Sequence, residues 1–223
     1  MITSRRKVLD LDFFQDMEKE LRDELSYSTY PKSIKKNGFI YVDGNENDYL
    51  SFVITGQLRV YSQGLNGNAI TYYRLTPGDC CILTASFLFS KKNPALLIQA
   101  EADTELAVID SGHIKSWITK YPQLNQKIHS LLTEKMHLIS EKLNRIAFCT
   151  IECRVAAILK ERFSPGTTIK ITHQEIALEI GSAREVVSRA LKNFENEGII
   201  EILRGEIRIK SSDKIHDKIN LCE

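Results

Sequence analysis

The stretch ITHQEIALEIGSAREVVSRALKNFENEGII, residues 171–200, contains two helix-start signals only ten residues apart. Thr172 and Glu175 have the spacing of a capping box, in which each side chain bonds a backbone N–H group at the start of a helix. Ser182 and Glu185 repeat this spacing. Two starts so close together leave room for a first helix of only about two turns. The sequence therefore predicts two helices joined by a tight turn.

The turn is expected near Gly181, since glycine can adopt the left-handed conformation that a short connection between helices needs. The second helix should run to about Glu197 and stop at Gly198. The run that follows, IIEILRGEIRIK, alternates around Arg204-Gly205 and predicts a β-hairpin. The positions expected to pack the two helices together are Ile176, Ala177, Ile180, Val186, Val187, Leu191 and Phe194.

Two helices at this spacing, followed by a hairpin that resembles a wing, are typical of a DNA-binding helix-turn-helix. The residues on the N-terminal face of the second helix, where such a helix meets base edges, are Arg184, Glu185, Ser188 and Arg189. Arginine can bond guanine O6 and N7 together, and glutamate can accept from cytosine N4. Lys192 lies further along the same polar face. A solvated helix with ordinary charges is the alternative, and the capping boxes together with the hairpin argue against it.

Charge limits the way this segment can bind nucleic acid. The whole chain has a formal net charge of +1, and between residues 165 and 210 seven lysines and arginines are balanced by seven glutamates. Nonspecific attraction to phosphates should therefore be modest, so that affinity must depend on a dimer and on base contacts.

The rest of the chain has a β-rich region between helical ones. Residues 9–26 have apolar residues at helical spacing, whereas short β-rich runs from about 33 to 110 favour a sandwich or barrel. Residues 121–147 form one long helical pattern, and residues 151–163 form a further helix. The long helix has a narrow apolar stripe: Ile128, Leu132, Met136, Ile139, Leu143 and Ile146. The stripe approximates a two-stranded seam and favours self-association, with packing on its own β-domain as the alternative.

The cysteines and the hydropathy indicate a compartment. The chain has five cysteines, an odd number, and its N-terminus does not read as an export signal. No apolar run approaches the roughly 20 residues that span a bilayer. We therefore expect reduced thiols, a cytoplasmic location and no membrane association.

Over nearly its whole length the chain resembles the Crp/Fnr superfamily of bacterial transcription regulators. The most specific part, THQEIALEIGSAREVVSRALKNFENEGII, is similar to the family pattern T-x-Q-E-I-A, then G, then R-E-x-V-x-R, then L. The resemblance implies an α+β fold in three parts. Residues 1–120 would be a β-sandwich or jelly-roll sensor domain of the cyclic-nucleotide-binding type with an N-terminal helix, residues 121–147 a dimerisation helix, and residues 148–223 a winged helix-turn-helix. It also implies a homodimer on palindromic double-stranded DNA and RNA polymerase as a partner.

The resemblance can be carried over residue by residue. Arg184, Glu185 and Arg189 match the base-reading positions of the cyclic-AMP-receptor branch. Glu185, Ser188 and Arg189 also match the E-x-x-S-R signature of the Fnr branch. Both branches imply a half-site that contains GA, of the TTGA or TGTGA type.

Further DNA-binding candidates lie around the two helices. Thr172, Gln174 and Lys192 match positions that usually touch phosphates, and Arg204 of the hairpin and Ser182 of the turn are candidates as well. His173 stands where an arginine often sits in the family, so one phosphate contact is missing from the pattern.

The sensor region lacks the residues by which the family holds known effectors. Leu83 falls where cyclic-nucleotide binders carry a glutamate for the ribose, and Pro94 and Ala95 fall at the Arg-Ser pair for the phosphate. A buried phosphodiester needs such a cationic partner, which argues against cyclic AMP or cyclic GMP. No cysteine precedes Cys80, which argues against the iron–sulfur cluster of the oxygen-sensing branch. Residues 1–112 contain no histidine, which argues against haem held by a histidine of this region; haem held by Cys80 or Cys81 stays open, with no second ligand identified.

The adjacent pair Cys80-Cys81 is an unusual feature of this region. Two small buried side chains are one interpretation, and a thiol sensor or soft metal ligand is the other. Thr84 and Ser86 follow where the family's pocket usually opens. We therefore treat Cys80, Cys81, Thr84 and Ser86 as candidate residues of an effector pocket.

Two other functions remain as alternatives. An enzyme on a cupin-like barrel would need clustered histidines, and catalytic triads need a histidine as base; the β-rich region has none, so no catalytic residue or metal site is predicted. The second alternative is a regulator that binds DNA constitutively and carries a vestigial sensor. An apolar pocket leaves no motif, so the sequence does not separate this alternative from a regulator gated by a small molecule or a redox signal.

Overall fold

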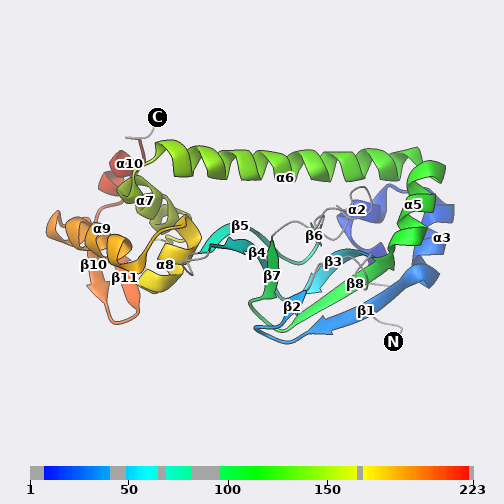
Figure 1. The fold of residues 1–223 in the computed structure, drawn as a ribbon, viewed down its shortest axis with the longest axis horizontal. Helices are drawn as coiled ribbons and strands as arrows, with labels where there is room; N and C mark the ends of the chain where they lie inside the picture. The colour runs from blue at the N-terminus through cyan, green and yellow to red at the C-terminus, as the bar shows by residue number, and fades with distance from the viewer. Residues whose placement is uncertain (1–7, 41–48, 65–68, 82–95, 165–167, 221–223) are drawn as a thin grey trace. The chain divides into compact units, whose positions relative to one another are not determined.

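The computed structural model of the chain describes residues 8–40, 49–64, 69–81, 96–164 and 168–220. The chain divides into two compact units, Met1–Ser62 with Tyr72–Ile139 and Gln63–Thr71 with Ser140–Glu223. Most of the strands belong to the first unit, and the predicted helix-turn-helix belongs to the second (Figure 1). The α+β fold class is therefore confirmed.

Two four-stranded sheets make up the β-rich region. One has the strand order β1-β8-β3-β6, with bounds Thr29–Ile34, Thr104–Asp110, Tyr49–Thr55 and Cys80–Cys81 in that order. The other has the order β2-β7-β4-β5, with bounds Phe39–Ile40, Leu97–Ala100, Leu58–Gln63 and Ala69–Leu75. In the first sheet β8 pairs antiparallel with both β1 and β3, and Phe52 of β3 lies opposite Ala107 of β8.

The two central strands of the first sheet, β3 and β8, are largely buried on both faces. Val53 and Leu106 belong to a core shared with residues of the second sheet, such as Ile98. Phe52, whose side chain points to the opposite face, belongs to a second core with Trp117 from a helix. β3 is consequently buried from its first residue to its sixth, as expected of a strand covered by layers on both sides.

Helices α2 (Asp12–Gln15), α3 (Lys19–Ser28) and α5 (Ser111–Lys120) contribute to that second core. Glu24 of α3 accepts hydrogen bonds from Trp117 Nε1, Lys120 Nζ and, at 2.8 Å, the Tyr121 hydroxyl. These donors, Lys120 first, lower the pKa of Glu24 to about 2. One carboxylate thus joins α3 to the end of α5.

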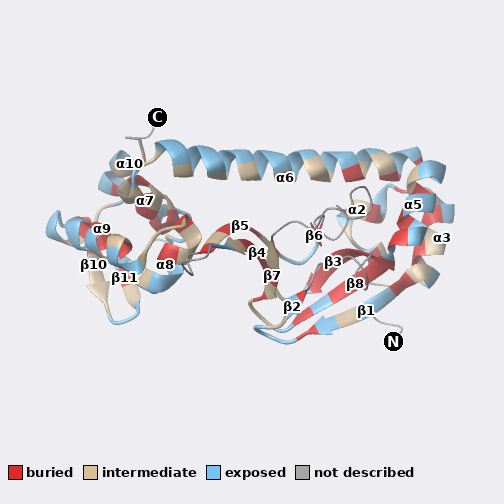
Figure 2. Ribbon diagram, in the orientation of Figure 1, coloured by how far each residue is buried: buried red, intermediate tan, exposed pale blue. Residues whose placement is uncertain are grey.

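Helix α6 (Pro122–Phe148) is the long helix that the sequence predicts. Near its start Ile128 is fully buried in the core that contains Trp117. After Lys135 its residues are exposed or intermediate (Figure 2). Met136 and Leu143, two members of the predicted stripe, are 71% and 58% exposed. The chain itself therefore leaves part of the stripe uncovered.

The second unit has its own hydrophobic core. Its helices are α7 (Ile151–Glu161), α8 (His173–Ile180), α9 (Arg184–Asn196) and α10 (Ser212–Asn220). Its small sheet has the order β10-β11-β9, with bounds Ile200–Leu203, Glu206–Ile209 and Ile169–Lys170. β10 and β11 pair antiparallel from Ile200 opposite Ile209 to Leu203 opposite Glu206, so the predicted hairpin is confirmed.

Several elements lie outside the sequence predictions, among them β1, α5, β9 and α10. β1 contains Pro31, which weakens a strand signal, but β1 is an edge strand, where the missing N–H need not cost a ladder bond. α5 begins after its N-cap Asp110, whose carboxylate accepts from Gly112 N–H at 2.7 Å. The sequence does not predict this helix, because no long run of apolar residues at helical spacing follows the cap. α10 is short, and Ile215 is its buried residue in the core of the second unit.

Glu24→Gln should lower the free energy of unfolding at pH 7 by about 1 kcal/mol, because a neutral amide bonds Lys120 more weakly than a carboxylate does. The effect is small because the Glu24 side chain is 38% exposed. The lowered pKa sets the sign of the pH dependence. The difference in free energy of unfolding between the parent protein and Glu24→Gln is fully present above about pH 4.5 and is lost as the pH falls toward about 2.

Urea unfolding at several pH values measures this difference. Glu20→Gln, a change at an exposed glutamate of the same helix, is the matched control and should have little effect. A difference between parent and Glu24→Gln that stays constant down to pH 2 would contradict the role given to the Glu24 charge.

Candidate nucleic-acid interface

Helix α8 begins with the predicted capping box. Thr172 Oγ1 accepts from the Glu175 N–H at 3.2 Å, and the Glu175 carboxylate accepts from the Thr172 N–H at 2.7 Å. These bonds satisfy backbone groups that have no partner inside the helix. Both side chains remain at the surface, since both residues are exposed.

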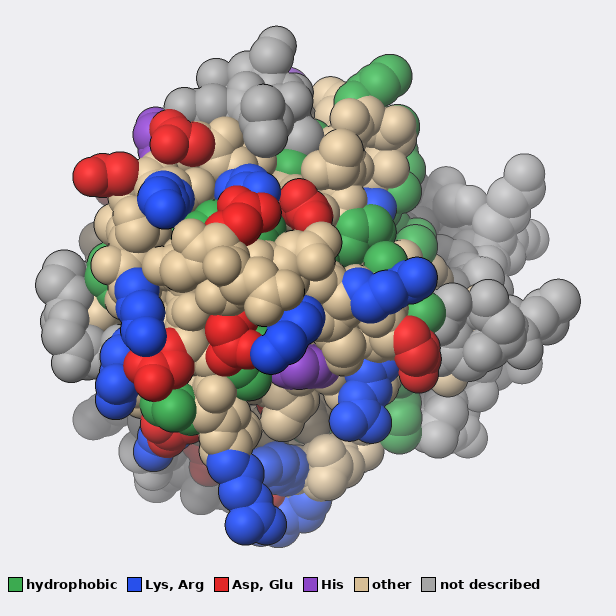
Figure 3. Space-filling model, turned by 90° about the vertical axis from the view of Figure 1, so that its left-hand side faces the viewer, with side chains coloured by type: hydrophobic (Ala, Val, Ile, Leu, Met, Phe, Trp, Pro, Cys, Tyr) green, Lys and Arg blue, Asp and Glu red, His purple; other side chains and the backbone are tan. Residues whose placement is uncertain are grey.

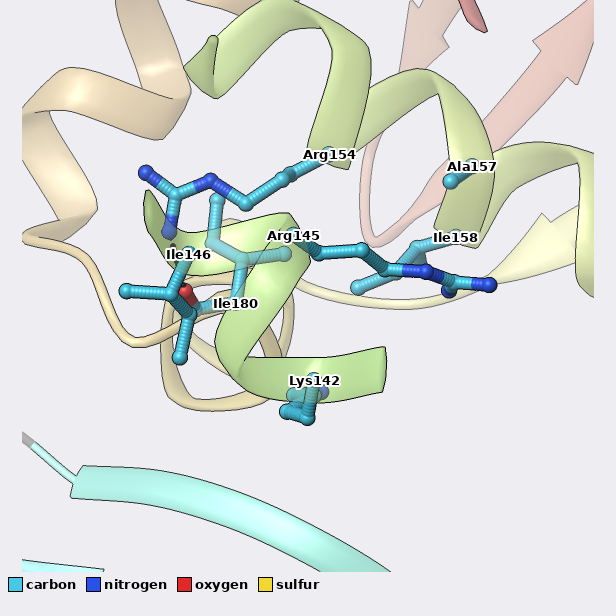
Figure 4. Close-up of a pocket in the computed structure, with 7 residues that line it drawn as sticks. All are labelled: Lys142, Arg145, Ile146, Arg154, Ala157, Ile158 and Ile180. Atoms are coloured by element: carbon cyan, nitrogen blue, oxygen red, sulfur yellow. Dashed lines mark hydrogen bonds between the residues drawn. The ribbon is translucent and has the colours of Figure 1, made fainter. Parts of the chain in front are cut away.

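The C-terminus of α8 is closed by two cations from other helices. Gly181 has the predicted left-handed conformation, with φ of 69°. Lys142 Nζ of α6 donates to the Glu179 carbonyl at 2.8 Å. Arg154 Nη1 of α7 donates to the Ile180 carbonyl at 2.9 Å (Figure 4). Carbonyls at this end of a helix lack intrahelical partners and carry partial negative charge, so cations stabilise them. No spacing in the sequence predicts this pair.

Ser182 is not the N-cap of α9, contrary to the second capping box expected from the sequence. The N-cap residue is Ala183, which makes no side-chain cap bond. The Ser182 N–H donates to the Ala177 carbonyl at 3.0 Å, so Ser182 still belongs to the end of α8. The turn is too short for one residue to end the first helix and cap the second.

The buried and exposed faces of α9 are clearly separated. The buried residues are Val187, Ala190, Leu191 and Phe194, which pack into the core of the second unit. Arg184, Glu185 and Arg189 are exposed. The side chains of these three make no hydrogen bond or ion pair with another described residue. They are therefore available to a partner molecule.

Ser188, the fourth candidate for base reading, is joined to α8. Its Oγ lies 2.8 Å from Nδ1 of His173, the first residue of α8. Both residues are partly buried. Burial, and after it the positive charge of Arg184, lowers the pKa of His173. The neutral imidazole is consequently favoured at neutral pH. In the sequence His173 stands out only as a departure from the family pattern, and no spacing predicts its bond to Ser188.

The remaining cations of this surface are largely balanced by glutamates. Lys192 Nζ lies 2.7 Å from Glu195, and Arg208 and Lys210 of the hairpin lie 3.1 and 3.6 Å from Glu201. Figure 3, which looks onto the side of Figure 1 where α9 and β10 lie, shows basic and acidic side chains interspersed. The modest local charge expected from the sequence agrees with this arrangement.

The other candidates for DNA contact lie at the edges of the two helices. Gln174 is exposed in the first turn of α8, and Ser182 is partly buried in the turn. Arg204 is exposed in the tight turn between β10 and β11, where Gly205 has φ of 76°. The hairpin thus places a cation at its tip.

The candidate effector residues Cys80 and Cys81 are buried on β6. They belong to different cores, Cys80 to the one with the helices and Cys81 to the one between the sheets. Burial, followed by the proximity of Cys81, raises the pKa of the Cys80 thiol. Buried thiols of raised pKa are poor nucleophiles, which favours the packing interpretation. Thr84 and Ser86 lie outside the described residues.

A buried lysine of α6 lies near Cys80 and has no counterpart in the sequence predictions. Lys135 is 6% exposed. Its Nζ lies 2.9 Å from Glu134 Oε1 and 4.0 Å from Asp79 Oδ1, and 5.7 Å from the ring centroid of Tyr73. A buried ammonium is costly without such partners, so these carboxylates hold it in place.

Neither a metal site nor a membrane span is found in the part of the chain that the structure describes. No group of three or more histidines, cysteines, aspartates and glutamates there could hold a metal ion. None of its helices combines the length and the apolar character needed to cross a bilayer.

Two family comparisons cover different parts of the chain. Residues 31–121 match the cyclic nucleotide-binding domain, and residues 153–217 match the Crp-like helix-turn-helix domain. The first match contains both sheets except the first two residues of β1, and the second contains α8, α9 and the hairpin.

Curated proteins and solved structures of similar length also match. The chain is 27% identical over 192 residues to the cyclic AMP receptor protein of Thermus thermophilus, which covers 85% of this chain and 88% of that protein. It is 21% identical over 211 residues to a CRP-like cAMP-activated global transcriptional regulator of Mycobacterium tuberculosis, with 91% and 93% covered. A crystal structure from Eubacterium rectale, described as a transcriptional regulator of the Crp/Fnr family, has a TM-score of 0.81 at 29% identity, with 94% and 98% covered.

Arg154→Met should loosen α8, because the Ile180 carbonyl loses its donor while the aliphatic part of the side chain is kept. We expect a loss of about 1–3 kcal/mol, the usual cost of a lost bond to a charged group. Hydrogen exchange should accelerate in α8 more than in α10. The control is Arg145→Met, since Arg145 lines the same small cavity (Figure 4) but makes no side-chain bond with another described residue. Equal exchange in both variants would contradict the role of Arg154.

Proposed function

The chain belongs to the Crp/Fnr superfamily of transcription regulators, and from this premise we propose that it is a homodimer that reads a palindrome in double-stranded DNA. Each half-site would contain GA, of the TTGA or TGTGA type. The observation that carries the proposal is the exposed face of α9. There Arg184, Glu185 and Arg189 have no side-chain partner among the described residues.

The chemistry of these three side chains suits a half-site with a G·C pair. A guanidinium can donate to O6 and N7 of guanine, and a carboxylate can accept from N4 of the cytosine on the other strand. Each good bidentate contact contributes about 1–3 kcal/mol of discrimination against a wrong base. Ser188 would add a fourth contact to the same face.

Phosphate contacts would hold the protein in register. The proposed residues are Thr172, Gln174, Ser182, Lys192 and Arg204. The first three lie around the ends of α8, and Arg204 lies at the tip of the hairpin. Lys192 would have to exchange Glu195 for a phosphate, since its Nζ lies 2.7 Å from that carboxylate. Such contacts fix orientation but do not read sequence.

The stripe of α6 supports the proposed dimer. Met136 and Leu143 are seven residues apart and largely exposed, and Ile139 between them is only partly buried. A second copy of the same helix would cover these side chains in a two-stranded seam, and the removal of apolar area from water would stabilise the pair.

We assign the sensor to residues 1–120, dimerisation to residues 121–147 and DNA binding to residues 148–223. A small molecule or a redox signal would act by binding or modifying one state of the dimer more than another. Because the thiols of Cys80 and Cys81 are buried, a small molecule is favoured over a redox signal that acts on these cysteines. Cyclic AMP is part of the names of two relatives, but Leu83, Pro94 and Ala95 argue against it in this chain.

A constitutive regulator with a vestigial sensor is the alternative within the same family. It would bind its operator with no ligand added. RNA polymerase is the further partner that membership of the superfamily implies.

Arg189→Ala should reduce base discrimination by about 1–3 kcal/mol and leave the dimer intact. Fluorescence anisotropy with reduced protein compares a duplex that carries two TTGA half-sites with a scrambled duplex at the same salt concentration. Arg162→Ala, which removes an equal charge from an exposed residue after α7, is the control and should keep selectivity. If Arg189→Ala selects the TTGA duplex as well as the parent does, the assignment of the recognition helix is wrong.

Leu143→Glu should weaken the dimer by at least about tenfold in Kd, because two buried carboxylates would face each other across the seam. Analytical ultracentrifugation over a range of concentrations measures the dissociation. Leu138→Glu places the same charge on the same helix outside the stripe, at a residue that is 37% exposed, and should leave the dimer unchanged. Equal effects of the two changes would argue against the proposed seam.

A further inference from the structure

We propose that His173 sets the direction of the Ser188 hydrogen bond and thereby makes the base preference of α9 depend on pH. The proposal rests on the proposed function, because it needs Ser188 to meet a base. Its observation is the 2.8 Å contact between His173 Nδ1 and Ser188 Oγ, which joins the first helix of the motif to the second.

A serine hydroxyl has one proton and two lone pairs, so one bond decides what it can offer to another partner. If Ser188 donates its proton to His173, only lone pairs remain for DNA. If Ser188 accepts from His173, its own proton is available for DNA. The imidazole therefore determines whether Ser188 meets a base as an acceptor or as a donor.

At neutral pH we assign Ser188 as the donor to Nδ1. A neutral histidine in water prefers the tautomer with the proton on Nε2, which leaves Nδ1 as an acceptor. Ser188 then accepts from a base, and in the major groove cytosine N4 and adenine N6 are the groups that donate. Thymine offers an acceptor, O4, at the edge where cytosine offers its amino group.

Protonation of His173 reverses the bond. Both ring nitrogens of a cationic imidazole carry protons, so Nδ1 must donate to Ser188 Oγ. The Ser188 proton then turns to a base acceptor such as thymine O4 or guanine O6. Acidification should shift the preference from cytosine toward thymine or uracil at the base that Ser188 faces.

The charges near His173 are few. Arg184 on α9 disfavours the cation, and the N-terminus of α8, which carries partial positive charge, does the same. Glu175, the acidic residue in the first turn of α8, is held by Thr172 in the capping box. In the complex with DNA, nearby phosphates would raise the pKa of His173, because negative charge favours the protonated imidazole.

A phosphate contact is the competing role for His173, since an arginine often stands there in the family. Protonation would then tighten binding to every duplex in parallel. Nδ1 already faces Ser188, so protonation at this contact instead changes the ratio between duplexes. The two roles are distinguished by the Kd values: a phosphate contact changes all of them by the same factor, whereas the Ser188 contact changes the ratio between duplexes.

The test uses duplexes that differ at one pyrimidine per half-site. Each C·G pair is replaced in turn by a U·A pair, which puts a carbonyl acceptor in place of the pyrimidine amino donor without adding a methyl group and exchanges guanine for adenine on the other strand. The position that Ser188 faces is the one at which Ser188→Ala abolishes the preference. Between pH 8 and pH 5.5 the ratio of the two Kd values should shift by about threefold to tenfold per half-site, as expected for one hydrogen bond.

His173→Gln is the matched variant, since glutamine can bond Ser188 but does not titrate between these pH values. Its ratio should stay constant with pH. The parent's other histidines lie on other elements: His113 on α5, His129 and His137 on α6, and His216 on α10. If the ratio of the two Kd values still changes with pH in His173→Gln, the proposal is overturned and one of these other histidines is responsible.

A measurement without DNA tests the bond itself. Long-range ¹H–¹⁵N correlation of the imidazole nitrogens reports the tautomer of His173, which should carry its proton on Nε2 at pH 8. Ser188→Ala should change the Nδ1 shift. An Nδ1–H tautomer at pH 8, or Kd values that fall in parallel for all duplexes, overturns the proposal. If the parent selects no duplex at any pH, the proposed function itself fails; selective binding with a constant ratio refutes this inference alone.

Discussion

The closure of both ends of α8 is the constraint on which the DNA-binding surface depends. A helix of eight residues gains little from its own backbone bonds and needs its ends satisfied by other groups. Thr172 and Glu175 satisfy one end from within the helix, and Lys142 and Arg154 satisfy the other from α6 and α7. The position of α8, and with it the support of α9, therefore depends on the helix that carries the proposed dimer seam.

This support explains how a chain of nearly balanced charge can present a selective surface. Arg208 and Lys210 of the hairpin are bonded to Glu201, and Lys192 is bonded to Glu195. These bonds weaken long-range attraction to phosphates. Arg184 and Arg189 remain exposed on a helix whose other face is fixed in the core by Leu191 and Phe194. In the proposed dimer, affinity would then come from base contacts in fixed geometry and from two half-sites bound together.

Sequence patterns predicted the features that depend on neighbouring residues. The capping box at Thr172, the left-handed Gly181 and the hairpin at Gly205 each follow from local backbone chemistry. Ser182 shows where such patterns fail. It has the capping-box spacing to Glu185, but its N–H is already bonded to the preceding helix, so it does not cap the next one. The contact between His173 and Ser188 joins residues 15 apart on different helices, so it was visible only once the two helices were packed.

The same distinction applies to the sensor region. The sequence allows Cys80 and Cys81 to be either packed side chains or a thiol sensor. In the structure the alternation of a strand places them in two different cores, where burial raises the pKa of Cys80. The sheet that carries them has helices packed on one face and a second sheet on the other. Ile128 places α6 in the core that contains Cys80. A molecule that binds beside Cys80 would have to displace side chains of this core. Because α6 packs into the same core, such a displacement could move α6. It would change DNA binding only if the molecule binds one arrangement of α6 more tightly than another.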